Sequence, residues 1–252
     1  MTDHVTVAET DDWVTITLGR PAKANALTGE MFVAVGDAVA DLDPAEADGA
    51  TIRGAGEHFS AGVDMSGVPE YGEMEPLTVR DQLEPIHDAL RAIEAADLPV
   101  VAALEGYVLG GGLELALACD LRIASETATF GLPEAEMGLA MDLGGPQKLP
   151  GFVGEGLTKY LVLTSETIGA RRAFEAGLVE ELHDAPDFEA ALEELEATLA
   201  AKPSYVLGLG KRQVHAARDG TVEDGMQQAI HHAIACYQEG ETQRRVAQFL
   251  GD

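Results

Sequence analysis

Residues 102–120 combine residue types that can perform chemistry. The segment reads AALEGYVLGGGLELALACD, in which an apolar run meets three consecutive glycines, Gly110, Gly111 and Gly112. We expect a strand, a tight turn and a helix that begins at these glycines. The first N–H groups of a helix have no intrahelical acceptor and lie at the positive end of its dipole. They could therefore stabilise an oxygen that gains negative charge, as an oxyanion hole does.

Three carboxylates accompany this segment. Glu114 lies among apolar residues, Glu134 ends the connector TFGLPE, and Asp142 lies in the glycine-rich stretch GLAMDLGGP. Burial of Glu114 would raise its pKa toward the range of a general acid or base. Alternatively, Glu114 only suits the helix dipole, and Asp142 only caps a turn. The residues alone leave these alternatives open.

A glycine-punctuated loop at 54–64, GAGEHFSAGVD, fits neither of two familiar motifs. A dinucleotide-binding G-x-G-x-x-G needs glycine where Phe59 stands, and a nucleophile elbow needs glycine where His58 stands. Ser60 with His58 and Asp64 could suggest acyl hydrolysis, but neighbours on one loop rarely form a catalytic triad. An acyl-CoA thioesterase or other hydrolase is therefore a minor alternative.

Strands and helices alternate along the first part of the chain, which predicts an α/β core with mostly parallel pairing. Apolar alternation predicts a hairpin of strands at 5–7 and 13–18. Helical spacing predicts helices near 28–42, 79–96, 187–201, 203–218 and 222–239. We expect a catalytic core at 1–185 and a C-terminal helical domain at 186–252 that packs on a neighbouring subunit.

The composition limits the partners of this chain. Its 252 residues carry 16 Lys plus Arg against 44 Asp plus Glu, a formal net charge of −28. We therefore expect neither nucleic acid nor an anionic membrane as a partner, and we expect adaptation to a high-salt cytoplasm. No signal-peptide pattern and no run of ~18 apolar residues occurs, which predicts a cytoplasmic protein. The two cysteines lack the spacing of a disulfide or zinc site.

Four motifs occur in order between residues 5 and 179. They are RPAKANAL at 20–27, FSAGVD at 59–64, GYVLGGGLELALACD at 106–120 and FGLPE at 130–134. Together they resemble the enoyl-CoA hydratase/isomerase family, the crotonase superfamily of fatty acid metabolism. The resemblance implies a spiral of ββα units with a C-terminal helical domain, assembled as a trimer or a dimer of trimers. It also implies acyl-CoA substrates, with coenzyme A entering as part of the thioester and no separate cofactor or metal.

The resemblance implies roles for individual residues. It assigns the oxyanion donors to the N–H groups of Ala61 and Gly111. It makes Glu134 the main acid/base of a hydratase and Glu114 its partner on the water that adds across the 2,3 double bond. The residues implied to bind coenzyme A are Arg20, Ala22, Lys23, Ala61, Gly62, Val63, Asp64, Gly110 and Gly111. A cationic loop would hold the CoA phosphates on an acidic surface, although Arg20 and Lys23 could also be ordinary solvated cations.

Asp142 favours a second activity. Typical hydratases of the family have glycine there, whereas several isomerases have an acid, and residues 136–144 are especially similar to dienoyl-CoA isomerases. Those isomerases tend to have Asp where this chain has Glu114. The alternative function is therefore an enoyl-CoA or dienoyl-CoA double-bond isomerase that uses Glu134 and Asp142. A non-catalytic subunit is a further alternative, against which the presence of both glutamates argues.

Overall fold

The computed structural model describes residues 2–10 and 12–251, apart from the side chain of Asp219. A six-stranded sheet forms its centre, in the order β1-β2-β3-β4-β6-β9. Its strands are β1 (Val5–Thr10), β2 (Trp13–Leu18), β3 (Gly49–Gly54), β4 (Val100–Leu104), β6 (Leu121–Ser125) and β9 (Glu181–His183). The β1–β2 pair is antiparallel, which confirms the predicted hairpin, and all the following pairs are parallel.

A second, three-stranded sheet lies beside the first, in the order β5-β7-β8. It contains β5 (Tyr107–Leu109), β7 (Thr129–Gly131) and β8 (Ile168–Gly169). The chain passes from β4 to β5 and again from β6 to β7, so each turn adds one strand to each sheet. This repeated step is the expected spiral of strand pairs followed by a helix.

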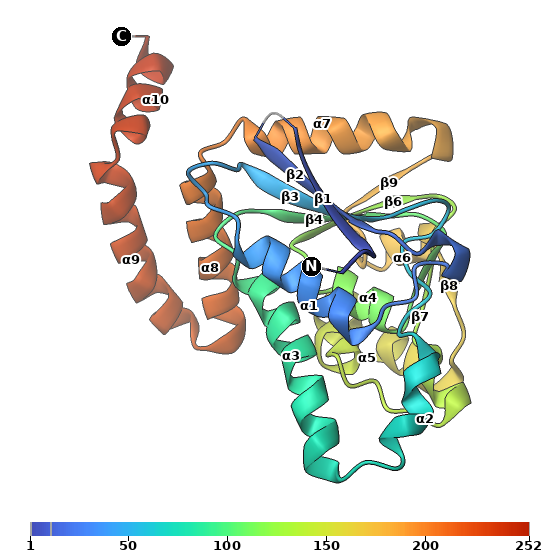
Figure 1. Ribbon diagram of the computed structural model, residues 1–252. Coiled ribbons are helices and arrows are strands. Elements are labelled where there is room, and N and C mark those ends of the chain that lie inside the picture. The colour runs from blue at the N-terminus through green and yellow to red at the C-terminus, as the bar shows by residue number, and fades with distance from the viewer. Residues whose placement is uncertain (1, 11, 252) are drawn as a thin grey trace.

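Helices cover both faces of the larger sheet (Figure 1). On one face lie α1 (Gly29–Ala40) and α3 (Pro76–Ala95), and on the other lies α7 (Phe188–Ala200). Successive strand residues point to opposite faces, so Val100 and Ala102 join the main core while Val101 and Ala103 pack with Phe188. The close contact of α1 with α3 needs glycine at position 36, because a Cβ there would lie 2.5 Å from Ala89.

Three smaller helices lie among the spiral turns. These are α2 (Val68–Tyr71), α4 (Gly111–Ala116) and α6 (Ala170–Glu175). A longer helix, α5 (Gly145–Thr164), is kinked at Gly154, where φ is +74°. The start of α4 and the start of α5 carry the residues that form the candidate site.

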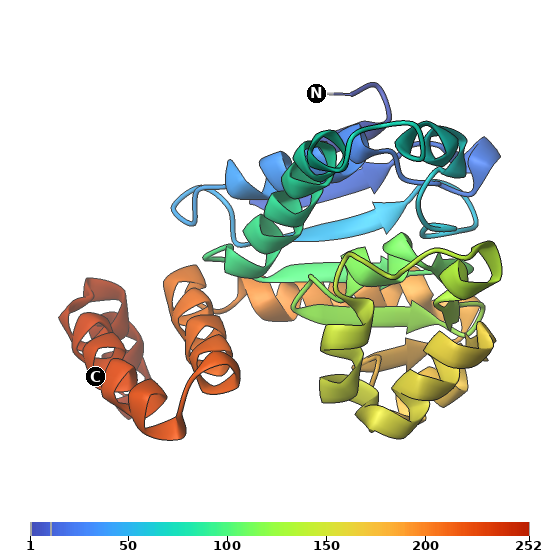
Figure 2. The same ribbon diagram turned by 90° about the horizontal axis from the view of Figure 1, so that it is seen from below.

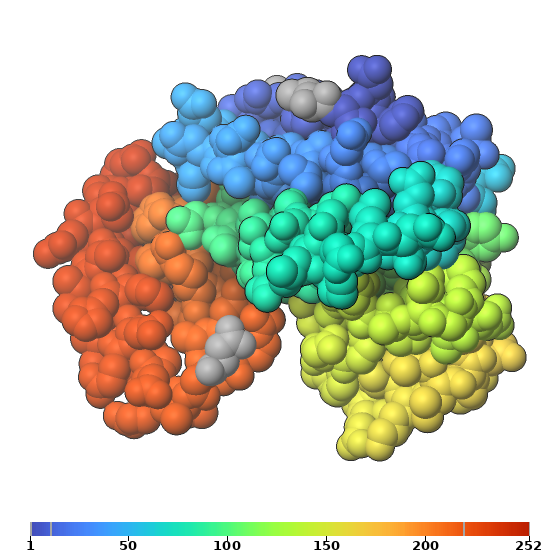
Figure 3. All heavy atoms as spheres, turned by 60° about the horizontal axis from the view of Figure 1, so that its bottom comes forward, coloured from blue at the N-terminus to red at the C-terminus, as the bar shows by residue number. Residues whose placement is uncertain are grey.

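The C-terminal helices project from the spiral (Figures 1 and 2). They are α8 (Ser204–Asp219), α9 (Val222–Gln238) and α10 (Gly240–Leu250). Lys211 on α8 holds them to the spiral, because its ammonium group donates to Asp120 (2.8 Å) and to the carbonyl oxygen of Ile93 (3.2 Å). Figure 3 shows a deep hollow between these helices and the region of α5. Among the described residues, no helix is both long and apolar enough to cross a membrane.

Candidate active site

The turn between β5 and α4 has the predicted form of strand, turn and helix. Gly110 has φ +50° and ψ −127°, a conformation that a residue with a side chain rarely adopts. A Cβ there would lie only 2.6 Å from Oε1 of Glu134, so this glycine also makes room for that carboxyl group. The N–H of Gly111, at the start of α4, has no acceptor among the described residues. This N–H is free to bind a substrate oxygen.

The prediction that Ala61 supplies the second oxyanion donor is wrong in this structure. Its N–H donates to the carbonyl oxygen of Ala24 (2.8 Å), and the N–H groups of Gly62 and Asp64 are also used. Val63 is different, because its N–H finds no acceptor within the described part of the chain. A Cβ on Gly111 would lie 2.8 Å from Cγ2 of Val63, so these two residues are neighbours. The pair of free donors is therefore Val63 and Gly111.

Glu114 is 2% exposed, and its Oε1 accepts hydrogen bonds from the N–H groups of Leu143 (3.1 Å) and Gly145 (2.8 Å). Burial raises its pKa to about 7, and the negative charges of Glu134 and Asp142 add to the rise. The two backbone donors oppose it. The carboxyl group therefore binds N–H groups at the start of α5 and does not cap α4, the helix that carries it.

Glu134 lies in a short 3-10 helix, Pro133–Met137, directly after β7. Burial raises the pKa of its carboxyl group, and the charge of Asp142 raises it further. Its Oε2 is buried and lacks a hydrogen-bond partner among the described residues. A buried polar atom of this kind normally has a partner, so a water molecule or a substrate group is expected to bind there. The buried Glu114 and the half-buried Glu134 thus place two carboxyl groups next to the free donors.

Asp142 is exposed on the loop before α5. Its side chain makes no hydrogen bond or ion pair with any described residue, so the turn-capping alternative is not supported. Its negative charge helps to raise the pKa values of both Glu114 and Glu134. It lines a cavity of about 300 Å³ together with His87 and Lys148. The structure therefore brings all three predicted carboxylates into one region.

The predicted CoA-binding loop is held by an ion pair. The guanidinium group of Arg20 donates to Asp64 (2.7 Å) and to the carbonyl oxygen of Ala26 (2.6 Å), and its side chain is 13% exposed. Hydrogen bonds from Ser66 and then from Arg20 hold the pKa of Asp64 well below its usual range. Lys23, 58% exposed and 3.7 Å from Asp64, is the cation of the loop that faces solvent.

The residues of the hydrolase alternative do not form a relay. The Ser60 hydroxyl is buried and donates to the carbonyl oxygen of Asn25 (2.9 Å). The ring of His58 stacks on Tyr107, and its Nδ1 accepts the N–H of that residue (3.2 Å). Asp64 is paired with Arg20. Each side chain is thus used elsewhere, which argues against the thioesterase mechanism on this loop.

Asn25 is a buried residue whose role the sequence analysis missed. Its side chain accepts the N–H of Arg20 and donates to the carbonyl oxygens of Ala55 and His58. It therefore ties the cationic loop to the loop that carries Val63. The motif RPAKANAL offered the available signal, because Asn25 stands between Ala24 and Ala26 and a short amide side chain of this kind can bond to nearby backbone groups.

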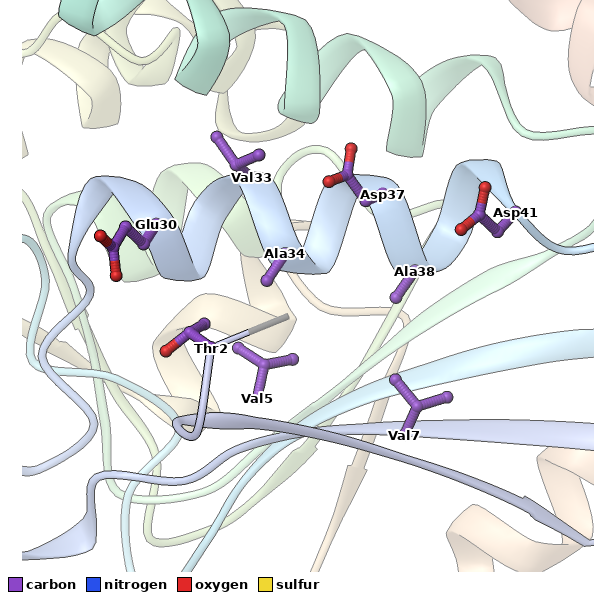
Figure 4. Close-up of a pocket in the computed structure, with 9 residues that line it drawn as sticks. All are labelled: Thr2, Val5, Val7, Glu30, Val33, Ala34, Asp37, Ala38 and Asp41. Carbon is purple, nitrogen blue, oxygen red and sulfur yellow. The ribbon is translucent and has the colours of Figure 1, made fainter.

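A second hollow of the surface lies apart from this site. A groove of about 600 Å³ separates β1 from α1 and is lined by Val5, Val7 and residues of α1 (Figure 4). None of the candidate site residues lines it. Within the described ranges, no group of three or more His, Cys, Asp or Glu side chains could hold a metal ion.

Comparisons with known proteins identify the family of this chain. A sequence profile of the enoyl-CoA hydratase/isomerase family matches residues 10–250. The crotonyl-CoA hydratase of Syntrophomonas wolfei is 31% identical over 92% of this chain and 86% of its own length. The 4-chlorobenzoyl coenzyme A dehalogenase-1 of an Arthrobacter species is 31% identical over 98% of this chain and 90% of its own.

Solved structures are similar as well. An enoyl-CoA hydratase of Thermoplasma volcanium has a TM-score of 0.89 at 30% identity, covering 98% of this chain and 97% of its own. A Thermobifida fusca protein solved in complex with acetoacetyl-CoA has a TM-score of 0.84 at 29% identity, covering 92% of this chain and 94% of its own. These matches extend through both the spiral and the C-terminal helices, and the chain belongs to the enoyl-CoA hydratase/isomerase family.

Proposed function

We propose that this protein is an enoyl-CoA hydratase, which adds water across the 2,3 double bond of an enoyl-CoA thioester. The observation that carries the proposal is the pair of carboxyl groups, the buried Glu114 and the half-buried Glu134, beside two free backbone donors. The unpartnered Oε2 of Glu134 offers an acceptor for water. Glu114, with a pKa of about 7, can exchange a proton near neutral pH.

The reaction begins when the thioester oxygen accepts hydrogen bonds from the N–H groups of Val63 and Gly111. Each donor of this kind lowers a barrier by ~2.7–4 kcal/mol, because it stabilises the negative charge of the enolate. Glu114 and Glu134 hold one water molecule, whose hydroxyl adds to Cβ. Glu134 takes the proton of the water and delivers a proton to Cα, which completes the addition.

The CoA part of the substrate would lie along Gly62, Val63 and Asp64. Lys23 is the exposed cation suited to a phosphate group, whereas Arg20 fixes the shape of the loop through Asp64. The structure of the Thermobifida fusca protein with acetoacetyl-CoA supports acyl-CoA binding in this fold.

An isomerase that uses Glu134 and Asp142 is the second candidate. It is favoured by the exposed Asp142 carboxylate, which has no partner in the part of the chain that the structure describes and acts on Glu134 through its charge. In that reaction the two carboxyl groups would move one proton along the acyl chain, and the double bond would shift with it.

Crotonyl-CoA hydration tests the first proposal. The absorbance of the conjugated enoyl group is followed in high salt for the wild type, Glu134→Gln and Asp142→Asn. We expect loss of absorbance with the wild type, a reduction of at least ~100-fold in Glu134→Gln because the acid/base is removed, and a smaller effect in Asp142→Asn. A parallel assay with a 3-enoyl-CoA follows gain of conjugation. Gain that depends on Asp142, without hydration of crotonyl-CoA, would replace the hydratase by the isomerase.

A further inference from the structure

The cavity that contains Asp142 borders the backbone segment that binds Glu114. It has a volume of about 300 Å³ and is lined by His87, Leu90, Asp142, Leu143, Gly144 and Lys148, among other residues. The N–H groups of Leu143 and Gly145 bind Glu114, and Leu143 and Gly144 line the cavity, so one backbone segment borders both. Asp142 lines the cavity, and its negative charge helps to raise the pKa values of both Glu114 and Glu134, so the cavity lies next to the candidate site.

A much larger groove lies beyond the cavity. It measures about 860 Å³ and is lined by residues of α5 and α8, including Phe152, Leu207 and Val214. Figure 3 shows the corresponding hollow between the C-terminal helices and the α5 region. Glu94, Gln147 and Lys148 line both the cavity and the groove. These three residues form the partition between the two spaces.

An ion pair closes this partition. The carboxylate of Glu94 on α3 binds the ammonium group of Lys148 on α5, and the two side chains are 19% and 20% exposed. The aliphatic part of the Lys148 side chain lies over Gly144 in the loop before α5. A Cβ on Gly144 would be only 3.3 Å from Cε of Lys148. Arg218 on α8 approaches the other oxygen of Glu94 at 3.8 Å. The pair therefore spans the crevice between α3 and α5.

We propose that the far end of the acyl chain lies in this cavity, and that the Glu94–Lys148 ion pair closes the cavity toward the larger groove and so restricts the site to short acyl chains. The proposal rests on the proposed acyl-CoA function. A long alkyl chain could enter the larger groove only by separating Glu94 from Lys148, and this would leave two partly buried charges beside an apolar chain. The polar side chains of His87 and Asp142, which also line the cavity, offer an alkyl chain few apolar contacts that could offset this cost.

The double variant Glu94→Ala/Lys148→Ala tests the proposal, because it opens the partition without a change in net charge. Its kcat/KM is measured with crotonyl-CoA, octenoyl-CoA and dodecenoyl-CoA. We expect the ratio of dodecenoyl-CoA to crotonyl-CoA to rise at least about tenfold over the wild type, the scale of discrimination that small changes in an apolar pocket produce.

The matched control is Arg53→Ala/Glu189→Ala. It also removes an ion pair between two elements (2.8 Å), and neither of its residues lines the cavity or the groove. The control should keep the wild-type ratio. An unchanged ratio in the Glu94/Lys148 variant, or a wild type that prefers dodecenoyl-CoA, would overturn the proposal.

Binding separates this proposal from the hydratase proposal. The affinities of butyryl-CoA and dodecanoyl-CoA, measured by calorimetry, need no turnover. We expect the ratio of the two affinities to shift toward dodecanoyl-CoA in the double variant, even if the protein hydrates neither enoyl substrate. If circular dichroism shows that the double variant does not fold, Lys148→Ala alone provides the same comparison. Equal affinity ratios in wild type and folded variant would contradict the role of the ion pair.

Discussion

At the scale of single residues, the site depends on groups whose environment disfavours charge. Glu114 is surrounded by apolar residues of α4 and lies near two other carboxyl groups. Its pKa is raised from 4.5 to about 7, so at neutral pH part of the folded molecules hold a proton on Glu114 that the unfolded chain has released. A stored proton of this kind suits a group that must exchange protons with water near neutrality.

The raised pKa of Glu114 predicts a pH dependence of stability. A carboxyl group whose pKa is higher in the folded state stabilises the fold when protonated, so its contribution is present below pH 4.5 and is lost as the pH rises through about 7. The loss is on the order of 3 kcal/mol in the free energy of unfolding. Urea unfolding in high salt, at pH values on either side of this window, measures it. Glu114→Gln should reduce the difference between the two pH values, and an unchanged difference would contradict the assignment.

At the scale of elements, the turn at the start of α4 places the N–H of Gly111 close to the carboxyl group of Glu134. β5 ends at Leu109 and α4 begins at Gly111, so one residue makes the whole turn. That residue, Gly110, adopts a backbone conformation that favours glycine, and a Cβ on it would collide with the carboxyl group of Glu134. The turn therefore aims the free N–H of Gly111 and positions Glu134 at the same time.

Gly110→Ala should damage both stability and activity. The added Cβ would lie 2.6 Å from Oε1 of Glu134, and the backbone strain costs ~1–3 kcal/mol. We expect a lower midpoint of thermal unfolding and a fall in kcat greater than in KM, since Glu134 must move. Gly156→Ala is the control, because a Cβ there meets nothing within 4 Å. A variant at Gly110 with wild-type kcat would show that the turn does not position the acid.

At the scale of the whole molecule, the C-terminal helices leave an apolar face uncovered. On α9 the residues Val222, Met226, Ile230 and Ile234 recur every fourth position and are exposed, and Phe249 is exposed on α10. A contiguous apolar face of this kind is typical of a contact with another protein. We infer that it contacts further copies of this chain, in the trimer or dimer of trimers that the family resemblance implies.

Light scattering coupled to size-exclusion chromatography tests this assembly. The wild type in high salt should elute with the mass of three or six chains, and Ile230→Lys should release smaller species because burial of an unpaired charge is costly. Gln227→Lys is the matched control, since Gln227 is an exposed polar residue of the same helix. A monomeric wild type, or equal dissociation of both variants, would argue against the interface.

The sequence by itself determined much of this protein. Hydrophobic periodicity fixed the hairpin, the main helices and the helical C-terminal region, because period and chain direction are local properties. The three glycines indicated a helix start at Gly111, since one of them, Gly110, has the positive φ that the tight turn requires. The types and order of Glu114, Glu134 and Asp142 identified the region where the chemistry would lie.

Only the tertiary structure decided which hydrogen-bond donors and charged groups in that region remain available to a substrate. Ala61 and Val63 look equally able to donate in the sequence, but the segment that lies alongside uses Ala61 and leaves Val63 without an acceptor. Arg20 looks like a solvated or phosphate-binding cation, yet Asp64, distant in sequence, takes its guanidinium group. These choices depend on long-range contacts, and a hydrogen-bond donor can serve a substrate only where the fold has not already supplied its partner.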